Sequence, residues 1–528
     1  MRSRDLLKMV SAMAFAAAAA VPALFADVKP AKIFNSNMVL QREAEVPVWG
    51  WADPGEPVEV TFAGQTRSTT ADAKGEWEVR FSPFALNKTG ETMTIKGKNT
   101  VELKNILVGD VWLCAGQSNM EMNFGWGIMD GDKFMAESKN YPQIRRIKVT
   151  RKSSDSPLKK LDASDWSVCS PDTVSPYTAA GYFFARKLTK ELDSLPIGIL
   201  DDNWSGSKIE PFIAPEGFES IPEFAARAKV VRSNEPGREE WKAARAKYLA
   251  DLKAALPKAE KRFAENRDFT DILPKLPQTA DSSRYNAMMA PIVRFPVKGV
   301  IWYQGCSNGG DGILYLKYMK ALVEGWRKVW KNPDMPFYYV QLAAYQAVTT
   351  DPKGGNGYAR IREVQAMALS IPHTGMACTI DIGQSNDIHP KNKIDVGERL
   401  ALWALAKTYG KDVVFSGPMF KSMKIEGNRI RLSFDYAEGL MTAVKKGYAK
   451  PVPAPGQAPS NFALCGKDGK WVWANAVIEG GDILVSSPDV QEPAAVRYAY
   501  RACPVDLNVY NGAGLPMVPF RTDEQGLK

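Results

Sequence analysis

The stretch Gly109-Asp-Val-Trp-Leu-Cys-Ala-Gly-Gln-Ser-Asn-Met-Glu-Met122 carries an apolar run that stops abruptly at a turn of small residues. Residues 106–114 predict a buried strand, and the pair Ala115-Gly116 allows the backbone to turn sharply after it. Ser118 therefore follows the carboxyl end of a strand, where open α/β sheets place their ligands. A serine there is a candidate nucleophile, although serines in this position also commonly cap helices.

A serine hydroxyl becomes an effective nucleophile only when a base takes its proton. The chain contains two histidines, His373 and His389. His389 lies in Asn386-Asp-Ile-His-Pro-Lys-Asn-Lys393, with Asp387 two positions before it. One loop would thus supply the base and its orienting carboxylate, so we predict His389 and Asp387 for these roles. Asp381, at the end of a predicted strand, is the alternative carboxylate.

Three blocks follow one another along the chain: Gly116-Gln-Ser-Asn-Met120, Trp302-Tyr-Gln-Gly305 and Asp387-Ile-His-Pro390. Together with Phe34-Asn-Ser-Asn-Met-Val-Leu-Gln41 and Tyr510-Asn-Gly-Ala-Gly-Leu-Pro516, they resemble the bacterial sialate O-acetylesterase family. This family is a carbohydrate-esterase branch of the SGNH hydrolases, and the likeness covers nearly the whole chain after the leader. The resemblance implies a Ser-His-Asp esterase that removes acetyl groups from sugars. Many SGNH enzymes place the acid three residues before the histidine, where this chain has Asn386.

Ester hydrolysis also needs an oxyanion hole, in which each preorganised donor contributes roughly 3 kcal/mol. We expect the backbone N–H groups of Ser118 and Gly206 to be two of the donors, because Gly206 lies in a loop directly after a predicted strand. Gln304 is the expected side-chain donor, with Asn308 behind it. The candidates for substrate contacts are Gln117, Asn119, Glu210 and Arg284.

Two positions depart from the family pattern. The loop of Gly206 resembles Gly-Gly-Thr-x-x-Glu, but this chain has Ser205 in place of the first glycine. The block after Tyr303 usually reads Gln-Gly-Glu-Ser-Asn, and Cys306 replaces its glutamate. Neither change removes a predicted member of the triad.

Residues 1–26 have the pattern of a secretory signal peptide: Arg2, Arg4 and Lys8 precede an apolar, Ala-rich run that ends in small residues. No later apolar run is long enough to cross a bilayer, so we expect an exported protein, periplasmic or secreted, with no membrane partner after cleavage. The net charge of +9 falls to +7 without the leader, which carries three basic residues and one acidic residue. This mild bias gives no reason to expect nucleic acid as a partner. The oligomeric state stays open.

Six cysteines lie far apart, at positions 114, 169, 306, 378, 465 and 503. No Cys-x-x-Cys pair occurs and histidines are scarce, so we expect no metal site and no cofactor. Export permits disulfides, and six cysteines allow 15 complete pairings, so the pairing remains open. Cys114, at the end of an apolar strand, is predicted to be a small buried residue.

The chain after the leader has three regions that differ in hydrophobic pattern. Residues 27–104 show period-two strands with turns, which predicts a small antiparallel β domain. Residues 105–412 alternate strands with helices, which predicts an α/β domain built as a flavodoxin-like three-layer sandwich, the SGNH-hydrolase scaffold that the resemblance also implies. Strand patterns return in residues 413–528, a C-terminal β-rich region that forms a separate domain or packs back on the N-terminal sheet.

A charged segment at about 216–283 interrupts the α/β pattern. Within it, apolar residues recur at steps of three and four and predict an amphipathic helix: Trp241, Ala244, Tyr248, Leu252 and Leu256. The segment is either a lid over the substrate or a helical decoration on the side of the domain.

The function that these patterns and the resemblance favour is that of a serine esterase acting on an acetylated carbohydrate, above all O-acetylated sialic acids. An esterase of acetylated xylan or another hemicellulose would share all the blocks. A non-catalytic glycan-binding protein is the alternative from another class. A glycoside hydrolase needs two facing carboxylates, and no such pair stands out.

Overall fold

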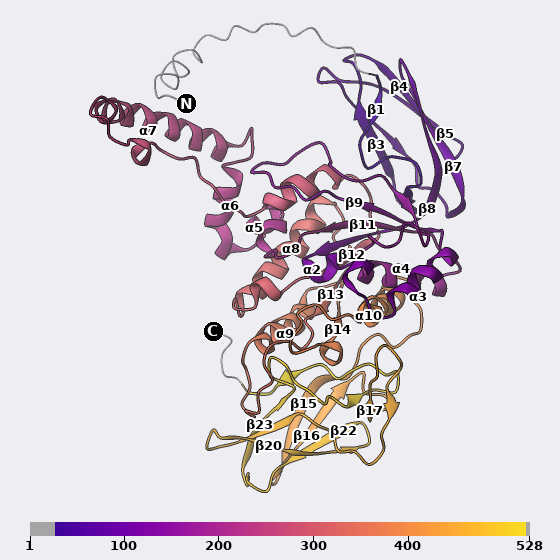
Figure 1. Ribbon diagram of the computed structural model, residues 1–528, viewed down its shortest axis with the longest axis vertical. Coiled ribbons are helices and arrows are strands. Elements are labelled where there is room, and N and C mark those ends of the chain that lie inside the picture. Colours follow the sequence, from indigo (N-terminus) through magenta and orange to yellow (C-terminus); the bar gives the residue numbers. More distant parts are fainter. Residues whose placement is uncertain (1–26, 524–528) are drawn as a thin grey trace.

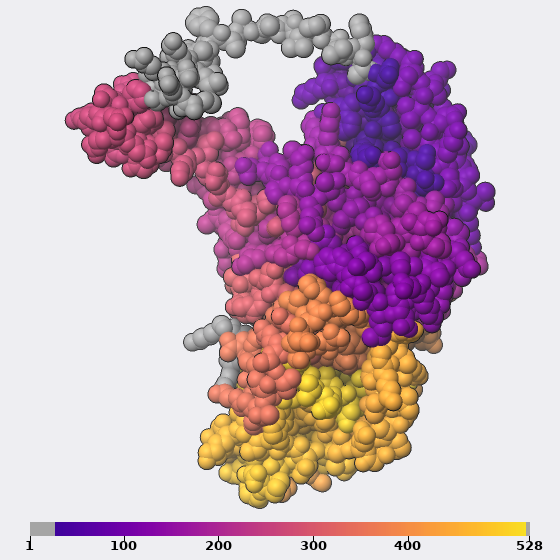
Figure 2. Space-filling model, in the orientation of Figure 1, coloured from indigo at the N-terminus to yellow at the C-terminus, as the bar shows by residue number. Residues whose placement is uncertain are grey.

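The computed structural model describes residues 27–523, and the predicted leader at 1–26 lies outside the described residues. The architecture is mixed α/β with several sheets, as the sequence predicted (Figure 1). An N-terminal β region and a C-terminal β region lie at opposite ends of the molecule, with the helices and the main parallel sheet between them (Figures 1 and 2). The C-terminal strands therefore do not pack back on the N-terminal sheet.

The central sheet has the strand order β10-β9-β11-β8-β12-β13-β14. All neighbours in it are parallel except β10, which runs antiparallel to β9. The two neighbours of β8 are later strands on opposite sides, so the carboxyl end of β8 is a topological switch point, where α/β proteins bind ligands. The strands are β8 (Thr100–Gly116), β9 (Ile144–Lys148), β10 (Ser167–Val168), β11 (Ile197–Asn203), β12 (Gly299–Tyr303), β13 (Phe337–Gln341) and β14 (Thr374–Cys378).

Both faces of this sheet are covered, since every residue of β11, β12 and β13 is buried. Helix α10 packs against α4 and against β13 and β14, while α8 packs against α5 and α9. The helices are α2 (Ser118–Glu121), α3 (Gly131–Glu137), α4 (Ala179–Glu191), α5 (Pro215–Ser220), α6 (Ala225–Arg232), α7 (Glu239–Ala264), α8 (Leu314–Val329), α9 (Tyr358–Met367) and α10 (Lys393–Lys407). Helices alternate with the parallel strands along the chain, as the sequence pattern of residues 105–412 predicted.

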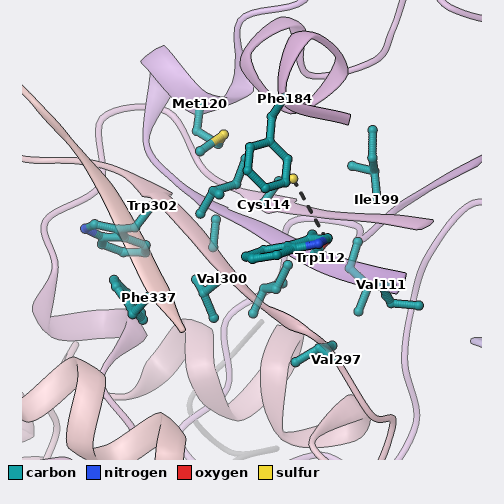
Figure 3. Close-up of a cluster of buried hydrophobic side chains, with 14 of the residues drawn as sticks. Val111, Trp112, Cys114, Met120, Phe184, Ile199, Val297, Val300, Trp302 and Phe337 are labelled. Atoms are coloured by element: carbon teal, nitrogen blue, oxygen red, sulfur yellow. Dashed lines mark hydrogen bonds between the residues drawn. The ribbon is translucent and has the colours of Figure 1, made fainter. Parts of the chain in front are cut away.

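An aromatic core supports the central strands (Figure 3). Trp112 of β8 contacts Phe184 of α4 edge to face, with ring centroids 4.9 Å apart. Trp302 of β12 packs in the same way against Trp326 of α8, at 5.8 Å. Cys114 is fully buried and reduced in this core, as predicted, and the other five cysteines are also free. This aromatic packing holds the carboxyl end of β8 rigidly in place.

Three of the N-terminal strands, β1, β3 and β6, form a separate small sheet, whereas β2, β4, β5 and β7 extend the central sheet through β8. Strand β8 pairs with β7 near its start and with β11 and β12 further on, so the expected boundary after residue 104 falls within one continuous strand. The N-terminal strands are β1 (Lys29–Pro30), β2 (Val39–Gln41), β3 (Val46–Trp51), β4 (Pro57–Phe62), β5 (Gln65–Thr70), β6 (Glu76–Phe81) and β7 (Asn87–Lys96).

The charged insertion contains α5, α6 and α7. Helix α7 stands off the body of the molecule (Figures 1 and 2). Within the described residues, its main packing partners are α6 and the turn η5 (Thr270–Ile272). Leu249 and Leu256 of α7 are 55% and 39% exposed. No helix in residues 27–523, α7 included, has the length and hydropathy of a membrane-spanning segment.

The C-terminal strands form three sheets, and a second hydrophobic cluster lies among them. Arg521 bonds Glu363 of α9 at 2.7 Å and so ties this region to the central one. The strands are β15 (Met419–Glu426), β16 (Arg429–Asp435), β17 (Met441–Val444), β18 (Val452–Pro453), β19 (Phe462–Gly466), β20 (Trp471–Trp473), β21 (Asn475–Glu479), β22 (Asp482–Ser486), β23 (Pro493–Tyr498), β24 (Val509–Tyr510) and β25 (Phe520–Arg521).

Candidate active site

The turn after β8 requires glycine at position 116. Gly116 has a φ of 144°, and a Cβ built on it would lie 2.3 Å from the carbonyl oxygen of Tyr303 on the adjacent strand. The N–H of Gln117 donates to that same carbonyl over 3.0 Å. The chain therefore turns tightly against β12, as the sequence predicted, and Ser118 becomes the first residue of α2, where it is 8% exposed.

A hydrogen bond joins the residues next to Ser118 and His389. The side-chain amide of Asn119 donates to the carbonyl oxygen of Ile388 over 2.9 Å. On its other side, Asn119 Oδ1 accepts from Nζ of Lys393 over 2.6 Å. The structure thus brings the predicted nucleophile and the predicted base into one site from distant parts of the sequence.

His389 presents an unpaired ring nitrogen in this site. Its Nε2 is buried and has no hydrogen-bond partner within residues 27–523. The ring lies edge to face with Trp126 at a centroid distance of 5.5 Å. Burial lowers the pKa of His389 below its ordinary value, and the nearby charge of Lys393 lowers it further. The imidazole is therefore held in the neutral form that a general base requires.

Asp387 adjoins the other side of the imidazole. Its Oδ1 lies 3.7 Å from Nδ1 of His389 and accepts the backbone N–H of His389 over 2.8 Å. Burial raises the pKa of Asp387, but that N–H and the charge of Lys391 outweigh burial and lower it overall. The carboxylate is ionised beside the ring, at a distance that needs only a small adjustment to become a hydrogen bond.

The alternatives to these residues occupy other environments. Asp381 forms two short bonds to Arg399, of 2.6 and 2.8 Å, which commit both of its oxygens. His373 precedes β14 at the amino end of that strand, whereas His389 lies beyond its carboxyl end, and His373 faces Asp334 at 3.1 Å. Neither residue is in position to replace its counterpart.

The two backbone N–H groups expected to bind an oxyanion, those of Ser118 and Gly206, have no acceptor in the described chain. Ser118 begins α2 without a side-chain cap, and its N–H has no acceptor in the described chain. The N–H of Gly206 is likewise without an acceptor among residues 27–523, and Gly206 is exposed with a φ of 72°. Glu121 fixes this loop, because its Oε2 accepts the N–H and the hydroxyl of Ser205 at 2.9 and 2.5 Å. Serine in place of glycine at 205 therefore adds an anchor.

Gln304 and Asn308 are committed to a buried network. The amide of Gln304 donates to Ser207 O at 3.1 Å and to Asn308 Oδ1 at 2.7 Å, which uses both of its N–H groups. The amide of Asn308 donates to Glu210 at 3.0 Å and to Asp311 at 2.8 Å. In this arrangement both side chains, and Glu210 with them, brace the loops around the site and offer no free N–H to a ligand.

Gln117 and Cys306 also belong to this frame. Oε1 of Gln117 accepts the backbone N–H of Gly305 over 3.1 Å and so joins the turn after β8 to the turn after β12. Cys306 stands where the family pattern has glutamate, and burial raises the pKa of its thiol. A neutral thiol gives Lys393 no counter-ion, and no carboxylate lies within 4.0 Å of Lys393 Nζ in the part of the chain that the structure describes.

Three residues at the site were not singled out from the sequence: Lys393, Trp126 and Glu121. Lys393 is fully buried, and burial lowers its pKa to about 7. Trp126 covers one side of His389 while remaining 38% exposed. The signals available were a lysine in the block of His389, and an acidic and an aromatic residue shortly after Ser118.

Comparisons with known proteins show that this chain is similar to carbohydrate esterases. The family profile described as carbohydrate esterase, sialic acid-specific acetylesterase, matches residues 275–406. The rat sialate O-acetylesterase is 26% identical over 93% of this chain and 93% of its own, and the human one is 28% identical over 79% and 78%. A solved structure of a carbohydrate acetylesterase from Xanthomonas citri is 33% identical, with a TM-score of 0.76, over 94% of this chain and all of that one.

These similarities define a carboxylic ester hydrolase. Within that class, the chain belongs to the sialate O-acetylesterase family of carbohydrate esterases.

Proposed function

We propose that this enzyme removes O-acetyl groups from sugars, O-acetylated sialic acids among them, with Ser118 as nucleophile, His389 as base and Asp387 as the carboxylate that orients the base. The observation that carries the proposal is the Asn119–Ile388 hydrogen bond, which joins the two loops beside an imidazole Nε2 that is buried and unpaired in the described chain. Because that nitrogen has no hydrogen-bond partner in the described chain, it is available to accept the proton of a serine hydroxyl.

In the proposed reaction, His389 Nε2 takes the proton of the Ser118 hydroxyl as Oγ attacks the acetyl carbonyl carbon. The N–H groups of Ser118 and Gly206 bind the oxyanion of the tetrahedral intermediate. The C–O bond to the sugar then breaks, and His389 returns the proton to the leaving sugar oxygen. Water, deprotonated by the same imidazole, hydrolyses the acetyl-serine and releases acetate.

In this proposal, Gln304 and Asn308 do not contact the oxyanion but hold the Gly206 loop in place. Their network holds the Gly206 loop against the turn after β12, since Gln304 bonds Ser207 and Asn308 accepts the N–H of Ile209 over 3.0 Å. An oxyanion hole works when its donors are already in place before the charge develops. The network supplies this rigidity for the N–H of Gly206.

We further propose that residues 105–412 form an SGNH-type three-layer domain, with residues 27–104 and 413–528 as flanking β regions. The parallel sheet with buried strands and a switch point at Ser118 supports this layout. Export of the chain to the periplasm or the medium is supported by the leader pattern of residues 1–26.

Acetate release from O-acetylated sialic acid and from an acetylated xylo-oligosaccharide tests the activity and ranks the substrates. Wild-type enzyme is expected to release acetate, and Ser118→Ala is expected to lose at least about a thousandfold in kcat, as triad nucleophiles do. Activity of Ser118→Ala near that of wild type removes Ser118 from the role.

A further inference from the structure

The guanidinium of Arg284 has no anion beside it. Its Nε is buried without a hydrogen-bond partner, and its Nη groups make no hydrogen bond or ion pair within residues 27–523. Burial lowers the pKa of Arg284, and no nearby carboxylate offsets this effect in the described chain. An arginine carries its charge at all physiological pH values, so this positive charge is uncompensated.

Arg284 is held in place by aromatic rings. Its Cζ lies 4.4 Å from the ring centroid of Trp204 and 5.7 Å from that of Phe212. It directly precedes η6 (Tyr285–Met289), a buried segment, so its backbone is anchored as well. A fixed, partly buried cation of this kind is prepared for a ligand, because little side-chain entropy remains to be lost on binding.

The same tryptophan connects Arg284 to the catalytic turn. The N–H of Trp204 donates to the carbonyl of Gly116 over 3.0 Å, two residues before Ser118. Two residues beyond Trp204 is Gly206, whose N–H is a proposed oxyanion donor. Through its contact with Trp204, Arg284 thus adjoins the loop that would hold the acetyl carbonyl.

We propose that Arg284 binds the carboxylate of an acetylated sugar acid while Ser118 attacks an acetyl ester on the same sugar. This inference rests on the proposed esterase function and adds the recognition of an anionic substrate to it. A carboxylate matches the planar fork of a guanidinium in two parallel hydrogen bonds. Neutral acetylated sugars such as those of xylan make no use of this charge.

The test compares each acid with its own methyl ester, which differs only in the charge of the carboxylate. The ratio of kcat/KM, free acid over methyl ester, is measured with O-acetylated sialic acid and with an O-acetylated galacturonic acid oligomer. Because the ratio is internal to one enzyme preparation, a partly folded variant does not change it. The pair of substrates that shows a high ratio identifies the sugar acid.

Wild-type enzyme is expected to prefer the free acid by about tenfold or more for at least one pair, the effect of one charge-assisted contact. Arg284→Met keeps the stem over Trp204 and is expected to bring that ratio close to one, and Arg284→Lys to give an intermediate ratio. The matched control is Arg294→Met, since Arg294 also lies 4.4 Å from a tryptophan ring, that of Trp49, but pairs with Glu78. Its ratio is expected to stay at the wild-type value.

A wild-type ratio near or below one for both pairs overturns the inference, as does a ratio that Arg284→Met leaves unchanged or that both methionine variants lower equally. Such a result leaves the esterase function standing if wild-type enzyme still hydrolyses the methyl esters and Ser118→Ala does not. Absence of acetate release from all four substrates would instead refute the proposed function itself.

Discussion

Asn119 donates its side-chain amide to the carbonyl of Ile388 over 2.9 Å, across 269 positions of sequence. The acceptor lies next to His389 and the donor lies next to Ser118, so this one bond sets the separation of the two loops. Asn119 also accepts from Lys393, a fully buried lysine for which it is the hydrogen-bond acceptor. The loops are therefore positioned by a buried polar chain of Lys393, Asn119 and Ile388.

Replacing Asn119 with alanine is expected to lower kcat by about a hundredfold, because a small displacement of the base from its productive geometry has an effect of this size. Loss of the acceptor for buried Lys393 is expected to lower the free energy of unfolding by about 1 to 3 kcal/mol as well. Kinetics and urea denaturation measure the two effects. The control is Asn508→Ala, which removes a similar amide-to-carbonyl bond of 2.9 Å, to Ala458. Equal losses of kcat in both variants would contradict the positioning role.

Asp387 and Asp381 are expected to respond differently to the same change. Asp387→Asn removes the charge beside Nδ1 of His389 and should lower kcat by orders of magnitude, roughly 10²- to 10⁴-fold, with little change in stability. Asp381→Asn leaves buried Arg399 without its full partner and should cost about 3 kcal/mol or more of stability. Thermal unfolding and kcat of the purified variants separate the two. If Asp381→Asn were the one with normal stability and low kcat, Asp381 would be the orienting residue.

The pH profile reports on His389. The base must be unprotonated, so kcat/KM is expected to rise with pH through a midpoint below the ordinary histidine pKa of 6.5, since burial and then Lys393 lower the pKa. With its own pKa lowered by burial to about 7, Lys393 is charged in that range. Lys393→Met removes this charge and should move the acid limb to higher pH. A midpoint that stays in place or moves to lower pH would show that the charge does not act on His389.

We expect Asp202 to make the free energy of unfolding depend on pH, independently of catalysis. Both of its carboxyl oxygens are buried without a partner in residues 27–523, and burial raises its pKa to about 7 from 3.8. Between these two values the folded chain holds a proton that the unfolded chain has lost. Stability therefore falls as pH rises through this window, by at most about 1.4 kcal/mol per pH unit from this group.

Asp202→Asn stays neutral and should lose less stability than wild type between about pH 5 and about pH 8. The free energy of unfolding in urea at the two pH values measures this difference. Parallel losses in the two proteins would mean that Asp202 is ionised in the folded state.

The parallel strands were predictable because they are buried on both faces and therefore appear in the sequence as apolar runs. Strand β9 shows no such run in the sequence, because it contains Arg145 and Arg146. In the structure Arg146 is buried by pairing with Asp201 of β11 at 2.8 Å, a compensation that only the neighbouring strand reveals. Asp381, which was expected at the end of a strand, lies instead in a 3-10 turn at Ile380–Ile382.

At the site, the sequence was sufficient to propose the serine and the histidine, because each type of chemistry had few candidates. The sequence was not sufficient to predict which amide N–H groups are free to bind an oxyanion. Gln304 has a side-chain amide of the kind that binds oxyanions, but both of its N–H groups donate to Ser207 and Asn308 instead. Which amide is free depends on contacts between distant loops, and these contacts leave no pattern in a single sequence.

The role of Ser118 is tested most directly by covalent labelling with a fluorophosphonate, followed by peptide mass spectrometry. We expect one adduct per chain, on the Ser118 hydroxyl, with loss of acetate release in proportion to labelling, and greatly slowed labelling in His389→Ala. An enzyme that releases acetate while Ser118 remains unlabelled, or whose adduct lies on another residue, would contradict this role for Ser118.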